Sequence, residues 1–545
     1  MQLLLSNFYG TTFLVAIYRM VIIMGIVLEL GAAPAPAPAP LLFPSEANAI
    51  LNSGWWNPSL LDPRNICSWN DIDCNDAGSI TGVRCPFDTP GLRLATLNLS
   101  AFKNLETLDA SHCGLEGTIP PEIGNLPKLT YLDLSQNSLD GEIPPSMTNL
   151  TQLESLILSH NNIQGPIPYE LLLKNLTVLD LSQNSLDGEI PSSLANLTQL
   201  KSLILSHNNI QGPIPRELFF LKNLTVLDIS YNIINGTLPF LLSKMPPALA
   251  NLTQLHSLIL SHNNIQGPIP HELLFLENLT VLDLSQNSLD GEIPPSLANL
   301  TQLKSLIIFG NNIQGPIPRE LFFLKYLTVL DISYNIINGT LPFSLSKMPP
   351  ARANLTQLDS LILSNNKIQG PIPRELLFLE NLIVLDLSQN SIDGEIPPSL
   401  ANLTQLESLI LSHNNIQDPI PQNLVLLKNL IFLDLSANKI SGTLPMSLAN
   451  LTKLKLLDIS HNLHSGSIKP LPVGRHAWLT TIYLRNNSIS GEIPPELGYL
   501  PFLGTLDLSY NNLSGRVPSS LAKLNQLEEL MLSNNNIQGS IPQNL

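Results

Sequence analysis

Hydrophobic and polar positions follow one repeating pattern along most of this 545-residue chain. The stretch Leu282–Gln302 reads LDLSQNSLDGEIPPSLANLTQ, and nearly the same sequence begins at Leu132, Leu179 and Leu385. Alignment on the leucines gives eighteen units, mostly 24 residues long, that share the pattern L-x-x-L-x-L-S-x-N-x-L-x-G-x-I-P-x-x-L-x-x-L-x-x. A period of this length predicts one array of stacked coils. After a short opening turn at Leu94–Asn104, the units begin at Leu105, Leu129, Leu153, Leu176, Leu200, Leu224, Leu255, Leu279, Leu303, Leu327, Leu358, Leu382, Leu406, Leu430, Leu454, Leu479, Leu503 and Leu527.

Each part of the unit predicts a local structure. The last two leucines of L-x-x-L-x-L alternate with one other residue, which is the period of a strand with one buried face. The Gly and Pro that follow require a turn, and the later L-x-x-L suits a short helical turn over the opposite side. One unit cannot bury enough apolar surface to fold alone, so neighbouring units must cover one another.

An asparagine follows the predicted strand in seventeen units, at the point where backbone carbonyls leave the sheet. Its amide can donate and accept at once, so we expect a column of asparagines to satisfy these groups between adjacent coils. In the first full unit the position is Cys113, which we interpret as a ladder residue and not as a reactive thiol. The column is Asn137, Asn161, Asn184, Asn208, Asn232, Asn263, Asn287, Asn311, Asn335, Asn366, Asn390, Asn414, Asn438, Asn462, Asn487, Asn511 and Asn535.

The pattern, with its L-x-G-x-I-P segment, closely resembles the plant-specific class of leucine-rich repeat. That class occurs in plant receptor-like kinases, receptor-like proteins and polygalacturonase-inhibiting proteins. The resemblance covers residues 94–545 and implies an α/β solenoid. In that fold a right-handed superhelix carries a parallel β-sheet on its concave face and short 3-10 or helical turns on its convex side.

The N-terminal segment predicts entry into the secretory pathway. Residues 1–33 contain an apolar run, Phe13–Leu28, interrupted by Arg19, and then the small residues Gly31-Ala32-Ala33. This order is typical of a signal peptide, and an uncleaved signal anchor is the alternative. Residues 34–44 are an Ala-Pro linker, a stiff extended spacer.

Residues 45–93 resemble the N-terminal cap of plant leucine-rich-repeat receptors, with a Trp pair at Trp55-Trp56 and two nearby cysteines. The resemblance implies a disulfide between Cys67 and Cys74, which fits a secreted protein. Cys85 has no obvious partner, and a bridge to Cys113 is the alternative that we favour less. The spacing of the four cysteines matches no zinc pattern, so no metal is expected.

Composition and motifs exclude several functions. The net charge is −16, and no basic patch with interleaved aromatics occurs, which argues against nucleic acid. The chain has no Gly-rich loop, no kinase motif and no nucleophile elbow, so we expect neither an enzyme nor a cofactor.

Fifteen N-x-S/T sequons occur, many of them in the repeat itself. In a secreted chain we expect glycans at several of them, on the convex and lateral faces, with the strand face left free. The sequon asparagines are Asn98, Asn149, Asn175, Asn196, Asn223, Asn235, Asn251, Asn278, Asn299, Asn338, Asn354, Asn402, Asn450, Asn486 and Asn512.

Two kinds of strand alternate from coil to coil, and residues 200–302 and 303–405 are near copies, which indicates internal duplication. One kind carries Asp with Gln or Tyr, as in Asp228/Tyr231, and the other carries Ile with His, as in Ile204/His207. We expect these positions to be exposed. Next-but-one coils would separate the histidines by ~9–10 Å, too far to share a zinc ion, so we expect solvated histidines. The aspartates are interpreted as scaffold, because no cleft or partner for acid–base chemistry is visible.

Departures from the copied pattern are the candidates for recognition. Aromatic and arginine side chains dominate binding contacts, and simple drift is the alternative for each position. The candidates are Phe309, Lys455, Tyr483, Arg485, Glu528 and Glu529.

The resemblance implies an extracellular recognition module of a receptor-like kinase or receptor-like protein, acting in cell-surface signalling at the plasma membrane or in the cell wall. Its concave face would bind a peptide, polysaccharide fragment or protein ligand, and its C-terminal coils would recruit a co-receptor kinase ectodomain. Some peptide-hormone receptors of this family hold a peptide's C-terminal carboxylate with an R-x-R pair on one strand. No strand here has that pair, so we do not predict that ligand class.

Two alternatives stay open. One is a secreted inhibitor of a cell-wall-degrading enzyme, similar to polygalacturonase-inhibiting proteins, although those are usually shorter. The other is a truncated receptor, because the sequence ends at Leu545 inside its last unit, without a C-terminal cap.

Overall fold

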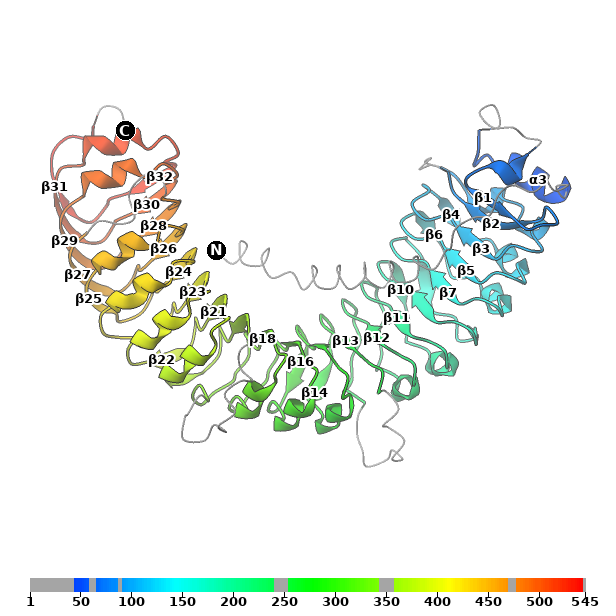
Figure 1. Ribbon diagram of the computed structural model, residues 1–545, viewed down its shortest axis with the longest axis horizontal. Helices are drawn as coiled ribbons and strands as arrows, with labels where there is room; N and C mark the ends of the chain where they lie inside the picture. The colour runs from blue at the N-terminus through cyan, green and yellow to red at the C-terminus, as the bar shows by residue number, and fades with distance from the viewer. Residues whose placement is uncertain are drawn as a thin grey trace.

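The structure is a computed structural model that describes residues 44–57, 65–86, 91–239, 253–342, 357–468 and 477–542. These residues form an open arc (Figure 1). One long sheet follows the inner edge of the arc, and short 3-10 helices follow its outer side. The predicted signal segment and most of the Ala-Pro linker lie outside the described residues.

The long sheet contains twenty strands in the described part of the chain. Two belong to the N-terminal cap: β1 (Ile72–Cys74) pairs antiparallel with β2 (Ile80–Arg84), and β2 pairs parallel with the first repeat strand. The other eighteen give one strand to each unit, which confirms the predicted parallel sheet. They are β3 (Thr107–Asp109), β5 (Tyr131–Asp133), β7 (Ser155–Ile157), β9 (Val178–Asp180), β11 (Ser202–Ile204), β12 (Val226–Asp228), β13 (Ser257–Ile259), β15 (Val281–Asp283), β17 (Ser305–Ile307), β18 (Val329–Asp331), β19 (Ser360–Ile362), β21 (Val384–Asp386), β23 (Ser408–Ile410), β24 (Phe432–Asp434), β26 (Leu456–Asp458), β28 (Thr481–Tyr483), β30 (Thr505–Asp507) and β32 (Glu529–Met531).

The register of this sheet places equivalent residues side by side. Leu203 of β11 lies between Leu179 of β9 and Leu227 of β12, and all three leucines are buried. The central leucines therefore form a continuous row inside the solenoid, and each coil covers its neighbour as a stacked array requires.

The L-x-x-L segments form 3-10 helices, which confirms the short helical turn that the sequence analysis predicted. Each begins directly after a proline of the I-P segment or its equivalent, and this proline has the extended backbone expected of the residue just before a helix. They are η4 (Pro121–Asn125), η5 (Pro145–Asn149), η6 (Ser192–Asn196), η7 (Arg216–Phe220), η10 (His271–Phe275), η11 (Pro295–Asn299), η12 (Arg319–Phe323), η15 (Arg374–Phe378), η16 (Pro398–Asn402), η17 (Gln422–Leu426), η18 (Met446–Asn450), η19 (Pro495–Tyr499) and η20 (Ser519–Lys523).

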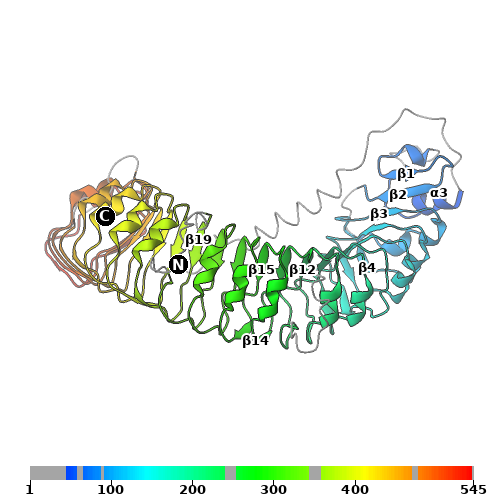
Figure 2. The ribbon, with the colours of Figure 1, turned by 60° about the horizontal axis from the view of Figure 1, so that its bottom comes forward.

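The segment after the asparagine forms short parallel strands, which the sequence analysis did not anticipate. Stacked coils present the same extended segment at the same height, so each supplies hydrogen-bond partners for the next. Figure 2 shows β14 on the opposite side of the coils from β12 and β15. These strands are β4 (Glu116–Thr118) with β6 (Ser138–Asp140), β8 (Gln164–Pro166) with β10 (Ser185–Asp187), β14 (Gln266–Pro268) with β16 (Ser288–Asp290), β20 (Gln369–Pro371) with β22 (Ser391–Asp393), and the five-stranded set β25 (Ser441–Thr443), β27 (Leu463–Ser467), β29 (Ser488–Glu492), β31 (Asn512–Gly515) and β33 (Asn536–Ile537).

The asparagine column is present as predicted. Every one of the seventeen side-chain amides donates to a backbone carbonyl of the preceding coil, as Asn232 does to Leu205 at 3.0 Å. The amide oxygen accepts a backbone N–H of that coil, as Asn232 does from Ile210 at 3.0 Å. The column therefore joins each coil to its neighbour at the end of the strand.

The cap covers the first coil with helix α3 (Pro44–Leu51) and the 3-10 helices η1 (Ile66–Ser68), η2 (Leu94–Thr96) and η3 (Leu99–Ala101). Trp55 stacks on Trp56 at 5.9 Å between ring centroids. The carboxylate of Glu46 is buried and accepts hydrogen bonds from the Ser79 hydroxyl at 2.7 Å and the Ile80 N–H at 3.0 Å. These contacts fix the helix over the sheet edge that the first coil would otherwise expose.

Two disulfides hold the cap. Cys67 is bonded to Cys74, the pair that the family resemblance implies. Cys85 is bonded to Cys113, so the alternative that the sequence analysis favoured less is the correct one. Cys113 does occupy the ladder position, and its backbone N–H donates to Asn137 at 3.0 Å. Its side chain, however, joins the cap to the first coil, because Cys85 directly follows β2 beside it.

Candidate functional site

The concave face is more tightly packed than the sequence analysis expected. The alternating Asp and Ile positions were expected to be exposed, but Asp228 is 3% exposed and its neighbour Ile204 is 8% exposed. The strands are about 4.8 Å apart, so an isoleucine fills the space between two aspartates. These positions form the floor of the concave face and offer little surface to a ligand.

Serine side chains hold the aspartates of this floor in place. The Ser230 hydroxyl donates to Asp228 at 2.6 Å, and the Ser230 backbone N–H donates to the same oxygen at 3.1 Å. The same pair of bonds recurs at Asp331 and Ser333. The aspartates are therefore scaffold, as interpreted from the sequence.

Burial raises the pKa of several of these carboxyl groups. It raises the pKa of Asp331 to about 6, and the neighbouring charges of Asp386 and Asp283 add to the effect. The pKa of Asp458 is also raised to about 6, first by burial and then by Asp434. Ionised carboxylates at neutral pH are thus held in the floor at a cost in stability.

The exposed positions lie three residues after the floor positions of each coil, directly before the ladder asparagine. There the backbone has positive φ in every repeat, between 50° and 67°, although only Gly310 among these residues is a glycine. The resulting bend points this row of side chains away from the floor, so the row forms the upper rim of the concave face.

Three rings of this row stack on one another. The ring centroids of His207 and Tyr231 are 4.1 Å apart, and those of Tyr231 and His262 are 3.9 Å apart. Burial, followed by the charge of His207, lowers the pKa of His262. The expectation of solvated histidines is therefore wrong for His262, because the tyrosine of the intervening coil fills the space between the two imidazoles.

Five of the six candidate recognition residues lie at three of the four strands of the long sheet that are nearest the C-terminal end. We call this group the C-terminal cluster: Lys455 precedes β26, Tyr483 ends β28, Arg485 follows it, and Glu528 and Glu529 lie at β32. In the sheet register Tyr483 lies between Asp458 and Asp507. The guanidinium of Arg485 lies 4.7 Å from the centre of the Tyr510 ring.

The electrostatics of the C-terminal cluster are mixed. Burial and the negative charges of Glu529, Asp458 and Asp507 raise the pKa of the Tyr483 hydroxyl, which keeps it a donor. Lys455, Glu528 and Glu529 are exposed. The cluster therefore offers both charges and an aromatic hydrogen-bond donor to a peptide-like ligand. Tyr510, at the rim position of the next coil, was missed in the sequence, although an aromatic residue one coil after Arg485 was a usable signal.

Phe309 does not belong to the C-terminal cluster. It follows β17, six strands of the sheet before β26, and is half-buried. A Cβ atom on the adjacent Gly310 would lie 2.7 Å from the amide nitrogen of Gln286. The Gln286 side chain therefore occupies the space that a side chain at position 310 would take.

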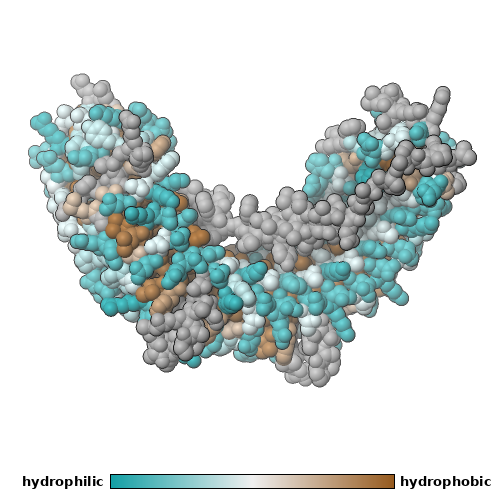
Figure 3. Space-filling model, in the orientation of Figure 1, coloured by the Kyte–Doolittle hydropathy of each residue, from teal (hydrophilic) through white to brown (hydrophobic). Residues whose placement is uncertain are grey.

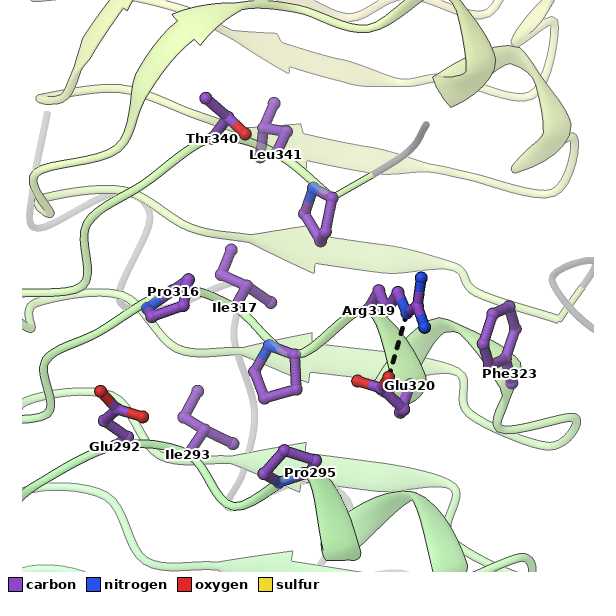
Figure 4. A pocket seen from close by; sticks show the side chains of 12 residues that line it. Glu292, Ile293, Pro295, Pro316, Ile317, Arg319, Glu320, Phe323, Thr340 and Leu341 are labelled. Carbon is purple, nitrogen blue, oxygen red and sulfur yellow. Dashed lines mark hydrogen bonds and ion pairs between the residues drawn. The ribbon is translucent and has the colours of Figure 1, made fainter. Parts of the chain in front are cut away.

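The outer side of the arc contains a hollow of ≈ 560 Å³ that the sequence analysis missed (Figure 4). Its wall is built from the I-P segments of three coils, with the Arg319–Glu320 ion pair at 3.0 Å across one side. The prolines that recur in each coil leave a step between coils. They were the signal in the sequence from which the hollow could have been predicted. The lining residues are Glu292, Ile293, Pro295, Pro316, Ile317, Pro318, Arg319, Glu320, Phe323, Thr340, Leu341 and Pro342.

All thirteen sequon asparagines in the described part of the chain are exposed. Asn251 and Asn354 lie outside it. Asn486 departs from the expectation that the strand face stays free of sequons, because it belongs to the exposed rim row beside Arg485. Its amide lies 2.9 Å from the imidazole of His461.

The described residues include no group of three or more metal-ligating side chains. None of the helices in the same ranges has the length and apolar character needed to cross a membrane.

Comparison with known proteins identifies the repeat. The leucine-rich repeat region family matches residues 91–236. The leucine rich repeat families match residues 253–313, 354–416 and 478–537, and residues 326–348 and 429–451. No curated protein matches the chain significantly.

Solved structures of plant receptors are similar to most of the chain. The plant peptide hormone receptor RGFR1 in complex with RGF2 is 34% identical, with a TM-score of 0.78 over 87% of this chain and 73% of the receptor chain. The Arabidopsis receptor kinase HAESA in complex with the peptide hormone IDA and the co-receptor SERK1 is 30% identical, with a TM-score of 0.61 over 92% of this chain and 95% of the other. PEPR1 with AtPEP1 is 27% identical, with a TM-score of 0.58 over 92% and 84%. Repeat pattern, cap and solenoid together place the chain in the leucine-rich-repeat family, among the plant receptor-kinase ectodomains.

Proposed function

We propose that this chain is the ligand-recognition module of a plant cell-surface receptor and acts in signalling outside the cell. Residues 1–33 would direct it into the secretory pathway, and its exposed sequons would carry glycans. Support comes from the likeness to receptor ectodomains over about nine-tenths of the chain.

The ligand that this face suits best is an extracellular peptide. RGFR1 is a peptide hormone receptor in complex with RGF2, and HAESA is in complex with the peptide hormone IDA. The C-terminal cluster has exposed charges of both signs and half-buried Tyr483 and Arg485 side chains, and peptide backbones and side chains can pair with such groups. A co-receptor ectodomain is the proposed second partner, by analogy with SERK1 in the HAESA complex.

One observation carries the proposal: Lys455, Tyr483, Arg485, Glu528 and Glu529 lie at three strands, β26, β28 and β32, within four consecutive coils of one face. The array is otherwise built from copied coils. Departures from the copy that gather in one place, on exposed or half-exposed positions, are the expected mark of a binding surface.

A peptide-display experiment tests the proposal. The secreted chain is immobilised and a randomised library of short peptides is selected against it. Lys455→Ala and Arg485→Ala should each weaken the enriched peptides at least about tenfold, the loss expected of a binding hot spot. Lys453→Ala is the matched control, because Lys453 lies only two residues from Lys455 but bonds to Asn429 at 2.8 Å, before the strand begins.

Enriched peptides that bind the wild-type chain and both C-terminal variants equally would contradict the assignment of the face. A loss of the same size in Lys453→Ala would show a general effect on folding and would also count against it.

A further inference from the structure

The 3-10 helices end on two kinds of residue. From η5 to η18, one kind of helix ends on the asparagine of an N-L-T sequon and the other on Phe or Leu. The asparagine ends are Asn149, Asn196, Asn299, Asn402 and Asn450, and the apolar ends are Phe220, Phe275, Phe323, Phe378 and Leu426. We call this row of helix ends the outer row.

Neighbouring helices contact each other, so the two kinds of residue lie side by side in the outer row. η11 contacts both η10 and η12, which puts Asn299 between Phe275 and Phe323. η16 contacts both η15 and η17, which puts Asn402 between Phe378 and Leu426. η6 contacts η7, so Asn196 lies beside Phe220.

Three of the five apolar residues of the outer row are exposed, whereas Phe323 and Phe378 are half-buried. Phe220 is 37% exposed, Phe275 38% and Leu426 48%. Figure 3 shows brown apolar patches, interrupted by polar ones, in the region where Figure 1 draws the yellow and green 3-10 helices. Phe323 also stands at one end of the hollow in Figure 4. A secreted protein gains stability and solubility when something covers such a row.

The asparagines of the outer row are also free to be modified. Within the described residues, no hydrogen bond engages the side-chain amide of Asn196, Asn299 or Asn402. The same N-L-T tripeptide also occurs three residues later in the coil, and there the amide is engaged. Asn223 donates to the Thr198 carbonyl at 2.9 Å, and the Thr225 hydroxyl of its sequon donates to the Lys201 carbonyl at 2.8 Å.

We propose that N-linked glycans on the asparagines of the outer row cover its apolar residues, each through its first N-acetylglucosamine ring. One face of a pyranose ring presents C–H groups, which pack on an aromatic or aliphatic side chain. Neighbouring helices of the outer row contact each other, so the first sugar on one helix end lies beside the apolar residue on the next. The outer row is then closed to protein partners, and the concave face is left to them.

The modification itself is a group transfer from a polyprenyl-pyrophosphate-linked oligosaccharide. The Asn amide nitrogen forms a bond to C1 of the first sugar as the C1–O bond to the pyrophosphate breaks. The amide loses one proton to a base, and the polyprenyl pyrophosphate leaves. The inference rests on the proposed function, because this donor is met only in the secretory pathway.

Glycopeptide mapping is the first test. The chain is expressed with its own N-terminal segment in a secreting cell line that makes high-mannose glycans. Asn196, Asn299 and Asn402 should be occupied. Glycans at Asn98 and Asn512 but at none of these three would overturn this inference and leave the proposed function standing. A chain that carries no glycan at any sequon would contradict the secretory route and so the proposed function itself.

A comparison of two enzymes tests the packing. An endoglycosidase leaves one N-acetylglucosamine on each asparagine, whereas an amidase removes the whole glycan. The single sugar should preserve the fully glycosylated behaviour. Complete removal should raise the fluorescence of a dye for apolar surfaces at least twofold and lower the melting midpoint by about 1–3 °C.

Variants separate this packing from a general effect of glycans. The triple variant Asn196→Gln/Asn299→Gln/Asn402→Gln should reproduce the amidase result, whereas Asn223→Gln should leave dye binding unchanged. In Phe220→Ser/Phe275→Ser/Phe323→Ser, the single sugar should make no difference to dye binding. Equal dye binding with and without the single sugar in the wild-type chain would overturn the proposal.

Discussion

The side-chain amide of Asn208 donates to the carbonyl oxygen of Leu181, one coil earlier, at 3.0 Å. The Oδ1 atom of the same amide accepts the backbone N–H of Leu186 in that coil at 2.9 Å. Both groups are buried, and no water reaches them to take the place of the amide. The ladder therefore satisfies backbone N–H and carbonyl groups that lie between the long sheet and the outer strands.

Asn208→Ala should lower the free energy of unfolding by about 2–4 kcal/mol, because it leaves a buried carbonyl and a buried N–H without partners. Urea unfolding followed by circular dichroism measures the change. Asn209→Ala is the control, because the neighbouring Asn209 side chain is exposed, and it should change the midpoint little. Equal effects of the two substitutions would contradict the role of the ladder.

Asp331→Asn should stabilise the chain at neutral pH. Burial raises the pKa of Asp331 from 3.8 to about 6, so the folded state binds the proton more tightly than the unfolded state. The stability from this group is fully present below pH 4 and is lost as the pH rises through 6. At pH 7.5 the asparagine should therefore add about 1–3 kcal/mol to the free energy of unfolding.

The same comparison at pH 4 should show little difference between Asp331→Asn and the wild type, because both side chains are then neutral. Asp187→Asn, at an exposed position, is the control and should change stability little at either pH. A gain at pH 4 as large as that at pH 7.5 would refute the electrostatic explanation.

Removal of the Cys85–Cys113 disulfide should destabilise the cap more than removal of Cys67–Cys74. The two bonds join residues 28 and 7 positions apart. Loop-closure entropy predicts losses of about 3–4 kcal/mol and about 2–3 kcal/mol, respectively. Differential scanning calorimetry of the two double Cys→Ala variants measures the order, and the reverse order would contradict the prediction.

Ala437→Gly should raise the free energy of unfolding by about 0.5–1 kcal/mol, because an L-residue is strained there and glycine is not. The backbone φ of Ala437 is 50°, and φ is positive at the equivalent rim position of every coil. Ala298→Gly is the control: Ala298 lies in the 3-10 helix η11, so glycine should destabilise there. Chemical denaturation of both variants provides the measurement.

The sequence predicted the solenoid because its determinants are local and repeated. One leucine spacing defines each strand, one proline begins each 3-10 helix, and one asparagine joins each coil to the next. Because the pattern recurs in eighteen units, a departure in one unit does not hide the structure that the others predict. The outer parallel strands were missed because their segments show no strand period alone and gain hydrogen bonds only from stacked neighbours.

The errors at the candidate site arose from side-chain packing between coils. Equivalent positions of two neighbouring coils carry the apolar Ile204 and the polar Asp228. Only the packed sheet shows that both side chains lie in the floor of the concave face. Sequence spacing correctly put His207 and His262 two coils apart but could not show that Tyr231 would fill the gap. The Cys85–Cys113 bond depends on how the cap sits on the first coil, which no repeat pattern contains.

The duplicated blocks 200–302 and 303–405 carry a consequence for how such a gene can change. Ser202 pairs with Val178, Ser305 with Val281 and Ser408 with Val384, so every block joins its neighbour through the same register. Unequal recombination that removes or adds one block would restore identical junctions, ladder bonds included. The cap and the C-terminal cluster would survive unchanged, but the span and relative rotation between them would shift in whole steps. Allelic length variants of this receptor would therefore be folded proteins with differently spaced ends.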